Sequence, residues 1–156
     1  MAYRTLIDAA ALAWLIAEDG VALFDCGFDL ADPAAGRARF GRAHIPGAAY
    51  LHLDEDLAGP PDGTNGRHPL PDRQALAARL AAAGARAGRQ IVAYDEAGGA
   101  YAARLWWMVK WLGHEDVAVL DGGLQAWTAA GLPALPGWRE SLHTAFAEYG
   151  PAFRPA

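Results

Sequence analysis

Cysteine is nearly absent from this sequence of 156 residues, in which Cys26 is the only one. A single cysteine forms neither an internal disulfide nor a cysteine-rich zinc site, so we expect a reducing compartment and no structural metal. Lysine is equally scarce, because Lys110 stands alone among 13 basic residues. The many Ala, Arg, Gly and Pro residues have GC-rich codons, which favours a bacterial source.

Long apolar runs and clusters of basic residues are also missing. The longest nearly apolar stretch, residues 100–112, is interrupted by Arg104 and Lys110 and is shorter than the ~20 residues that a membrane-spanning helix needs. The first ten residues carry no secretory signal pattern. A net charge of -5 with scattered basic side chains lacks the positive surface that nucleic acids require. We therefore expect a cytoplasmic protein that binds neither membranes nor nucleic acids.

What the sequence does contain is the pattern of one α/β domain. Hydrophobic residues make up 53 % of the chain and charged residues 20 %, as in globular proteins. Short apolar segments alternate with capped helical segments. The expected strands are residues 21–25, 48–51, 90–94 and 117–120, and the main expected helices are residues 9–18, 72–83, 100–112 and 124–130. This alternation predicts a mostly parallel sheet with helices on both faces.

The segment from Asp95 to Ala100 follows the expected central strand, and ligands of open α/β sheets bind at the carboxyl ends of strands. Its glycines could direct backbone N–H groups toward an anion. Asp95 and Glu96, however, would repel that anion. Two interpretations stay open, an anion cradle and a tight turn in which Asp95 caps the helix. Arg104, one turn further on, would pair with an acidic neighbour such as Asp95 or bind a substrate anion.

Two motifs resemble those of the rhodanese family. Residues 40–48, with the sequence FGRAHIPGA, resemble the first rhodanese signature, and residues 119–123 with Trp127 resemble the closing one. Shorter similarities occur at residues 25–30, 66–71 and 104–108. Over about residues 5–137, the chain resembles the N-terminal half of tandem-domain thiosulfate or 3-mercaptopyruvate sulfurtransferases. The resemblance implies a rhodanese-like α/β domain over residues 1–137, with about five strands, followed by a linker or tail over residues 138–156.

The resemblance also implies a chemistry. In such enzymes a cysteine thiolate at the start of the loop takes sulfane sulfur from a donor and becomes a persulfide, which it passes to cyanide or a thiol. Here Asp95 stands at that position, and a carboxylate cannot carry a persulfide. Cys26 ends an apolar strand, so we expect it to be buried and structural. The vacant active-site loop then comprises Asp95, Glu96, Ala97, Gly98, Gly99 and Ala100, with Arg104 behind it.

Two further residues gain a role from the resemblance. Asp54 and His68 align with an acidic residue and a histidine that face the active loop of the partner domain. There they resemble the orienter and base of a Ser-His-Asp arrangement. The alternative is that His68 is an ordinary loop histidine.

The function implied is that of a non-catalytic N-terminal half, inactive by itself. It would form an interdomain cleft with a cysteine-bearing second rhodanese domain, in the same gene product or a separate chain. The small-molecule partners would be a sulfur donor and a thiol or cyanide acceptor, with no cofactor and no metal. One alternative is a stand-alone inactive module that binds an anion or a protein. Another is an enzyme that uses Asp95 as nucleophile or base, although no metal-binding or phosphate-loop pattern accompanies it.

Overall fold

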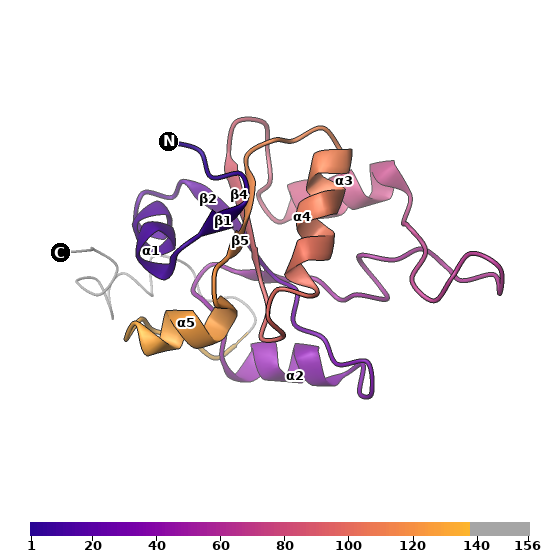
Figure 1. Cartoon of the computed structure of the whole chain (residues 1–156), viewed down its shortest axis with the longest axis horizontal. Helices are drawn as coiled ribbons and strands as arrows, with labels where there is room; N and C mark the ends of the chain where they lie inside the picture. Colours follow the sequence, from indigo (N-terminus) through magenta and orange to yellow (C-terminus); the bar gives the residue numbers. More distant parts are fainter. Residues whose placement is uncertain (138–156) are drawn as a thin grey trace.

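The computed structural model describes residues 1–137, so the linker or tail expected at residues 138–156 lies outside the described residues. Five parallel strands form one sheet through the middle of the molecule (Figure 1). In spatial order they are β1 (Leu6–Ile7), β5 (Val117–Leu120), β4 (Gln90–Tyr94), β2 (Val21–Asp25) and β3 (Ala49–Tyr50). This confirms the α/β class and the parallel five-stranded sheet.

Strand β1 has no counterpart among the strands expected from the sequence. It contains only two residues, too few to show a periodic pattern. Its place is set by hydrogen bonds to the neighbouring strand, in which Val119 donates to the Thr5 carbonyl and Asp121 to the Ile7 carbonyl, both at 2.9 Å. Long-range pairing therefore makes a strand where local sequence does not.

Helices cover both faces of the sheet. In Figure 1, α1 (Ala9–Ala17) and α5 (Gly123–Ala129) lie on one face, and α3 (Arg73–Ala82) and α4 (Ala102–Trp111) lie on the other. α1 and α3 begin as expected, because Asp8 and Asp72 each accept a backbone N–H from the first turn at 2.8 Å. α4 starts two residues later than its pattern predicts, after a turn that wraps around Asp95.

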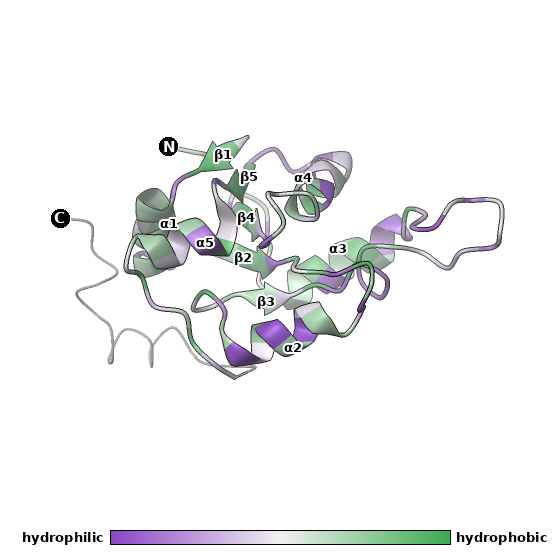
Figure 2. Cartoon of the chain, turned by 60° about the horizontal axis from the view of Figure 1, so that its bottom comes forward, coloured by the Kyte–Doolittle hydropathy of each residue, from purple (hydrophilic) through white to green (hydrophobic). Residues whose placement is uncertain are grey.

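The sheet separates two apolar cores. Leu23, Val92 and Tyr94 pack with α1 and α5, whereas Phe24 and Ile91 pack with α3 and α4. β2 and β4 are buried at every position, as central parallel strands require. In Figure 2 these strands are mostly green, while the helix α2 (Ala35–Arg42) carries several strongly hydrophilic residues. α2 thus contributes charged side chains more than core.

The topology places a crevice at the carboxyl ends of the central strands. After β2 the chain goes to β3 on one side and then to β4 on the other, so the loops after β2 and β4 diverge at their carboxyl ends. Ligands of open α/β sheets bind at such a point. Beside it, the irregular segment between β3 and α3 projects from the body of the domain (Figures 1 and 2). Within residues 1–137, no helix has the length and apolar character to cross a membrane.

We predict that Gly36→Ala destabilises the domain by about 1–3 kcal/mol, the usual cost of overpacking. A Cβ at this position in α2 would collide with the Gly27 carbonyl oxygen and lie 2.7 Å from the Tyr50 hydroxyl. Gly20→Ala is the matched control, because its Cβ would meet Leu15 only at 3.5 Å, an ordinary contact. Urea denaturation of both variants measures the difference. Equal free energies of unfolding would show that α2 shifts freely at this crevice.

Candidate functional site

The carboxylate of Asp95 lies at the centre of the loop that follows β4. Its Oδ1 accepts hydrogen bonds from the backbone N–H groups of Ala97 and Gly99, and its Oδ2 from those of Tyr101 and Ala102, all at 2.9 Å. Asp95 is 1 % exposed. The start of α4, where the helix dipole favours negative charge, thus receives its anion from within the chain.

This geometry decides between the two interpretations of the loop. The backbone N–H groups do converge as a cradle would, and the positive φ angles of Gly98 and Gly99, 67° and 88°, allow that curvature. The anion that they hold, however, is the Asp95 carboxylate itself. The capping interpretation is therefore correct, and the loop is not open to an external anion.

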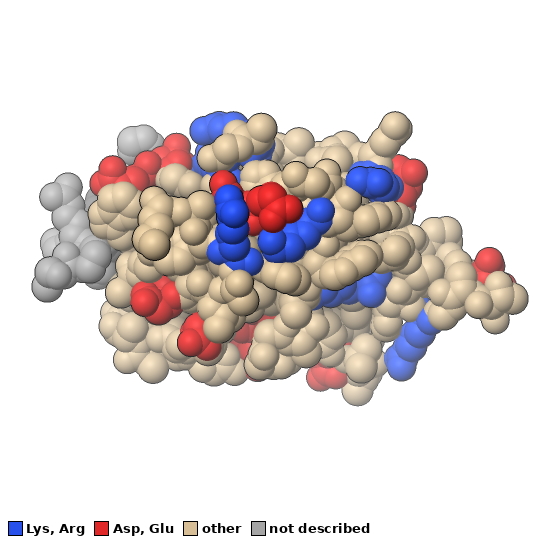
Figure 3. Space-filling model, turned by 45° about the horizontal axis from the view of Figure 1, so that its top comes forward, with Lys and Arg blue, Asp and Glu red and all other residues tan. Residues whose placement is uncertain are grey.

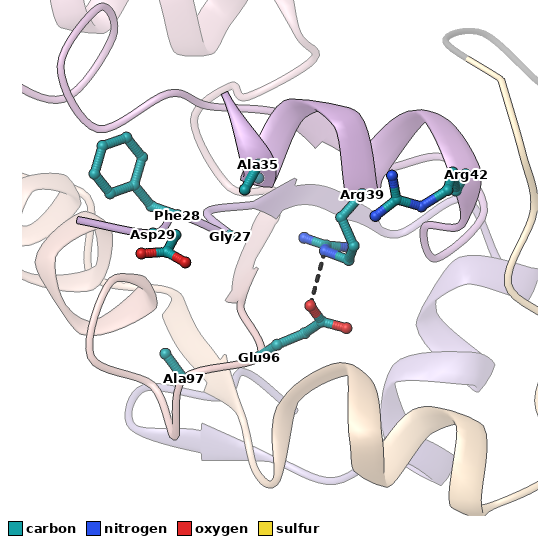
Figure 4. A pocket seen from close by; sticks show the side chains of 9 residues that line it. Gly27, Phe28, Asp29, Ala35, Arg39, Arg42, Glu96 and Ala97 are labelled. Carbon is teal, nitrogen blue, oxygen red and sulfur yellow. Dashed lines mark ion pairs between the residues drawn. The ribbon is translucent and has the colours of Figure 1, made fainter. Parts of the chain in front are cut away.

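A pocket of about 270 Å³ lies beside this loop (Figure 4). Arg39 of α2 reaches into it and binds both carboxylate oxygens of Asp25, at 2.6 and 2.9 Å. Its Nε pairs with Glu96 at 3.0 Å across the pocket, as the dashed line in Figure 4 shows. The pocket is lined by Gly27, Phe28, Asp29, Ala35, Gly36, Arg39, Arg42, Glu96 and Ala97.

Charges in this pocket largely cancel. Burial alone would lower the pKa of Arg39, but hydrogen bonds from its guanidinium to Asp25 and the charges of Asp25 and Glu96 raise that pKa above its ordinary value. The negative charge of Glu96, which the sequence suggested would repel an anion, is paired with Arg39. Figure 3 shows similar mixing on the face that it draws, where acidic and basic side chains lie in small groups. The buried Asp25 was itself a signal for a nearby cation, although the sequence could not say which arginine supplies it.

Asp54 and His68 come together as expected. His68 Nε2 lies 3.0 Å from Asp54 Oδ1 although the two residues are 14 positions apart in the chain. Nε2 is thus the ring nitrogen that faces the Asp54 carboxylate, and Nδ1 is the one that does not. Both residues face a second pocket, of about 290 Å³, lined by Phe28, Leu30, Pro33, Asp54, Ala58, Gly59, Pro61, Arg67 and His68.

A second histidine, His52, supports this pair and was missed by the sequence analysis. It is buried, and its Nδ1 accepts the backbone N–H groups of Asp54 and Glu55 at 3.1 and 3.3 Å. Its Nε2 donates to the Pro33 carbonyl at 2.9 Å, since a carbonyl only accepts. His52 therefore holds the turn that presents Asp54. Its place just after β3, two residues before Asp54, was the available signal.

Arg104 does not pair with Asp95, contrary to that part of the sequence prediction. Its guanidinium donates to three backbone carbonyls, those of Leu57 at 2.9 Å, His68 at 3.0 Å and Pro69 at 3.4 Å. The Asp95 carboxylate already has four backbone donors, and the helix turns Arg104 toward the projecting segment instead. Burial lowers the pKa of Arg104.

Cys26, which directly follows β2, is buried, as expected for a structural cysteine. Burial raises the pKa of its thiol well above the ordinary value, and the charges of Asp25 and Asp95 raise it further. The thiol is therefore protonated at neutral pH. Among residues 1–137, no three His, Cys, Asp or Glu side chains are grouped to hold a metal ion.

This chain is similar in sequence to proteins of a known family. A family model described as the rhodanese-like domain matches residues 8–130. The probable 3-mercaptopyruvate sulfurtransferase of Pseudomonas aeruginosa is 46 % identical over 144 residues, which cover 91 % of this chain and 50 % of that protein. Thiosulfate/3-mercaptopyruvate sulfurtransferase 2 of Arabidopsis thaliana is 48 % identical over 90 residues, 57 % of this chain and 25 % of that protein. The chain thus spans half or less of the length of these relatives.

A solved structure shows the same architecture. The 3-mercaptopyruvate sulfurtransferase from Leishmania major superposes with a TM-score of 0.79 at 29 % sequence identity. The match covers 88 % of this chain and 38 % of that one.

We predict that Asp95→Asn lowers the free energy of unfolding by at least about 2 kcal/mol. The Asn side-chain NH2 would face two of the four backbone N–H donors, and a buried donor without an acceptor costs ~1–3 kcal/mol. The control is Asp8→Asn, since Asp8 accepts one N–H at an exposed helix start, where Asn caps as well as Asp. Urea denaturation measures both variants. Equal, small losses in the free energy of unfolding would show that the Asp95 charge does not organise the loop.

Proposed function

The chain belongs to the rhodanese-like domain family, and on that basis we propose that it is the half of a thiosulfate or 3-mercaptopyruvate sulfurtransferase that lacks the sulfur-carrying cysteine. One observation carries this proposal: the Asp95 carboxylate occupies the ring of four backbone N–H groups that in an active domain would stabilise a thiolate. Cys26 is the only thiol in the sequence. It cannot take that role, because it is buried and protonated.

A second rhodanese domain, in the same gene product or in a separate chain, would supply the cysteine. Its thiolate would attack the sulfane sulfur of thiosulfate, releasing sulfite, or the sulfur of 3-mercaptopyruvate, releasing pyruvate once the enolate is protonated. The persulfide formed would then pass its outer sulfur to cyanide or to a thiol. None of these bonds forms on the present chain.

The contribution of this chain would be the Asp54–His68 pair. His68 Nδ1, the ring nitrogen that does not face Asp54, would take a proton from a hydroxyl or thiol at the interdomain cleft. The Asp54 carboxylate would stabilise the imidazolium that results. The pocket that both residues line would form this chain's side of the cleft.

Only one form of the alternative, a stand-alone inactive module, stays compatible with the structure. Asp95 fills the anion cradle, so an anion ligand in the loop is not favoured, and a protein partner would have to bind elsewhere. The third alternative, Asp95 as nucleophile or base, conflicts with a carboxylate that is 1 % exposed and has four hydrogen bonds.

Activity assays test the proposal. The 156-residue chain alone is predicted to release neither thiocyanate from thiosulfate and cyanide nor pyruvate from mercaptopyruvate. Joined to the half of the Pseudomonas relative that this chain does not match, it should turn over, and His68→Asn should lower kcat by about 10²-fold, the usual contribution of a general base.

His114→Asn is the matched control for that assay, because His114 bonds to the Arg89 carbonyl away from both pockets. Turnover by the chain alone that disappears in Cys26→Ser would refute the assignment. So would an unchanged kcat in the joined His68→Asn protein.

The loop itself can be tested with Asp95→Cys in a Cys26→Ser background. The four backbone N–H groups would then surround sulfur, so the thiol pKa should fall at least about one unit below the ordinary ~8.5. Adding Glu96→Gln removes a negative charge near the thiol, which should lower the pKa further. Alkylation rates against pH measure both values. A thiol that titrates like a free cysteine would mean that the loop does not keep a sulfur-activating geometry.

A further inference from the structure

We propose that Arg104 is a positioning residue that holds His68 against Asp54 by tying together the two ends of the projecting segment. This inference deepens the proposed function and rests on it, since it gives Arg104 a role in the proton-accepting pair. The role differs from both sequence predictions for Arg104, which were pairing with an acid and binding a substrate anion.

The geometry is that of a bridge. Leu57 lies where the segment leaves the body of the domain, and His68 and Pro69 lie where it returns. Arg104 Nη2 donates to the carbonyl of Leu57 at 2.9 Å and to that of His68 at 3.0 Å, while Nε donates to Leu57 at 3.1 Å. Gly59 adds one backbone bond to the Pro69 carbonyl, at 2.9 Å. The ends of the segment thus meet at one guanidinium.

The position of His68 follows from this bridge. The residue that offers its backbone carbonyl to Arg104 is the same residue whose ring Nε2 lies 3.0 Å from Asp54 Oδ1. Asp54 is held independently, because His52 binds its backbone N–H. The pair therefore needs a support on the His68 side, and Arg104 is the side chain that supplies it.

The surroundings of Arg104 favour hydrogen bonds to backbone carbonyls over an ion pair with a carboxylate. Within residues 1–137, no carboxylate lies within ion-pairing distance of its guanidinium. A half-buried cation with no acid nearby is costly unless other groups solvate it, and here backbone carbonyl oxygens do so. A planar guanidinium with five donors can reach carbonyls from two separate segments, whereas the ammonium of lysine is a single point.

Direct contact with substrate is not favoured. The pocket beside Asp54 and His68 is lined by Arg67 but not by Arg104. The Nε and Nη2 donors of Arg104 are already engaged by the chain. Arg104 therefore acts through His68.

The first experiment compares Arg104→Lys with the unchanged 156-residue chain by long-range ¹H–¹⁵N NMR of the histidine rings. We expect the His68 Nε2 signal to move toward that of free imidazole, because the ammonium can hold only one end of the segment. Carbethoxylation of His68 by diethylpyrocarbonate, followed by mass spectrometry, should become about 5-fold faster, the factor expected when one hydrogen bond is lost.

Two controls accompany this variant. Arg73→Lys changes another arginine that donates to a backbone carbonyl, that of Trp111 at 2.7 Å, and it should leave His68 unchanged. His114 in the same spectra reports loss of structure elsewhere in the domain. An unchanged His68 in Arg104→Lys overturns the inference, and so does a parallel change in His68 and His114.

A second variant covers the case in which lysine is not tolerated. Arg104→Ala with added methylguanidinium should regain the His68 signal as the added ion fills the vacated place. If neither variant folds and no ion restores the signal, Arg104 is a structural residue only and the positioning role is wrong.

Kinetics in the joined two-domain protein separate this inference from the proposed function. If Arg104 acts through His68, Arg104→Lys should lower kcat in the protein with His68 but not further in the His68→Asn protein. A loss in both backgrounds overturns the positioning role. If the single substitution His68→Asn leaves kcat unchanged, the proposed function is refuted. The NMR result still decides whether Arg104 holds His68.

Discussion

The structure at the carboxyl end of this sheet depends on the ring of four backbone N–H groups around the Asp95 carboxylate. This ring fixes the turn between β4 and α4 and sets the first residue of α4. Arg104 stands on the first turn of that helix, so the direction in which its guanidinium reaches follows from where the helix starts. A contact internal to one loop thereby influences the projecting segment 36 residues earlier in the chain.

The same ring explains how the loop of this rhodanese-like domain keeps its curvature with an aspartate at its start. Converging N–H groups need an acceptor, because buried donors without one are costly. Here the Asp95 carboxylate meets that need, whereas under the proposed function a thiolate would meet it in an active domain. The turn is thus held by backbone hydrogen bonds to the Asp95 side chain. Under the proposed function, this chain would offer its partner domain proton transfer and a shaped surface, both located at the Asp54–His68 pocket.

Charge balance distinguishes the two pockets. Asp25 is fully buried at the end of β2, and Arg39 from α2 neutralises it while also reaching Glu96. The charges at the switch point of the sheet are therefore balanced by the domain's own ion pairs. Among residues 1–137, the side chains that line the second pocket form one ion pair, Asp54–His68, in which one histidine nitrogen does not face the carboxylate.

The sequence by itself determined the parallel α/β class, the helix starts at Asp8 and Asp72, and the burial of Cys26. These features depend on residues a few positions apart, since caps and apolar periods are local. Only the tertiary structure decided that β1 is a strand, that His52 supports Asp54, and that Arg104 binds carbonyls rather than Asp95. The proximity of Asp54 and His68 was expected from family resemblance, but their contact crosses an irregular loop whose path local patterns do not encode. A long polar side chain takes its partner from whichever distant segment packs beside it, and that packing is a property of the whole fold.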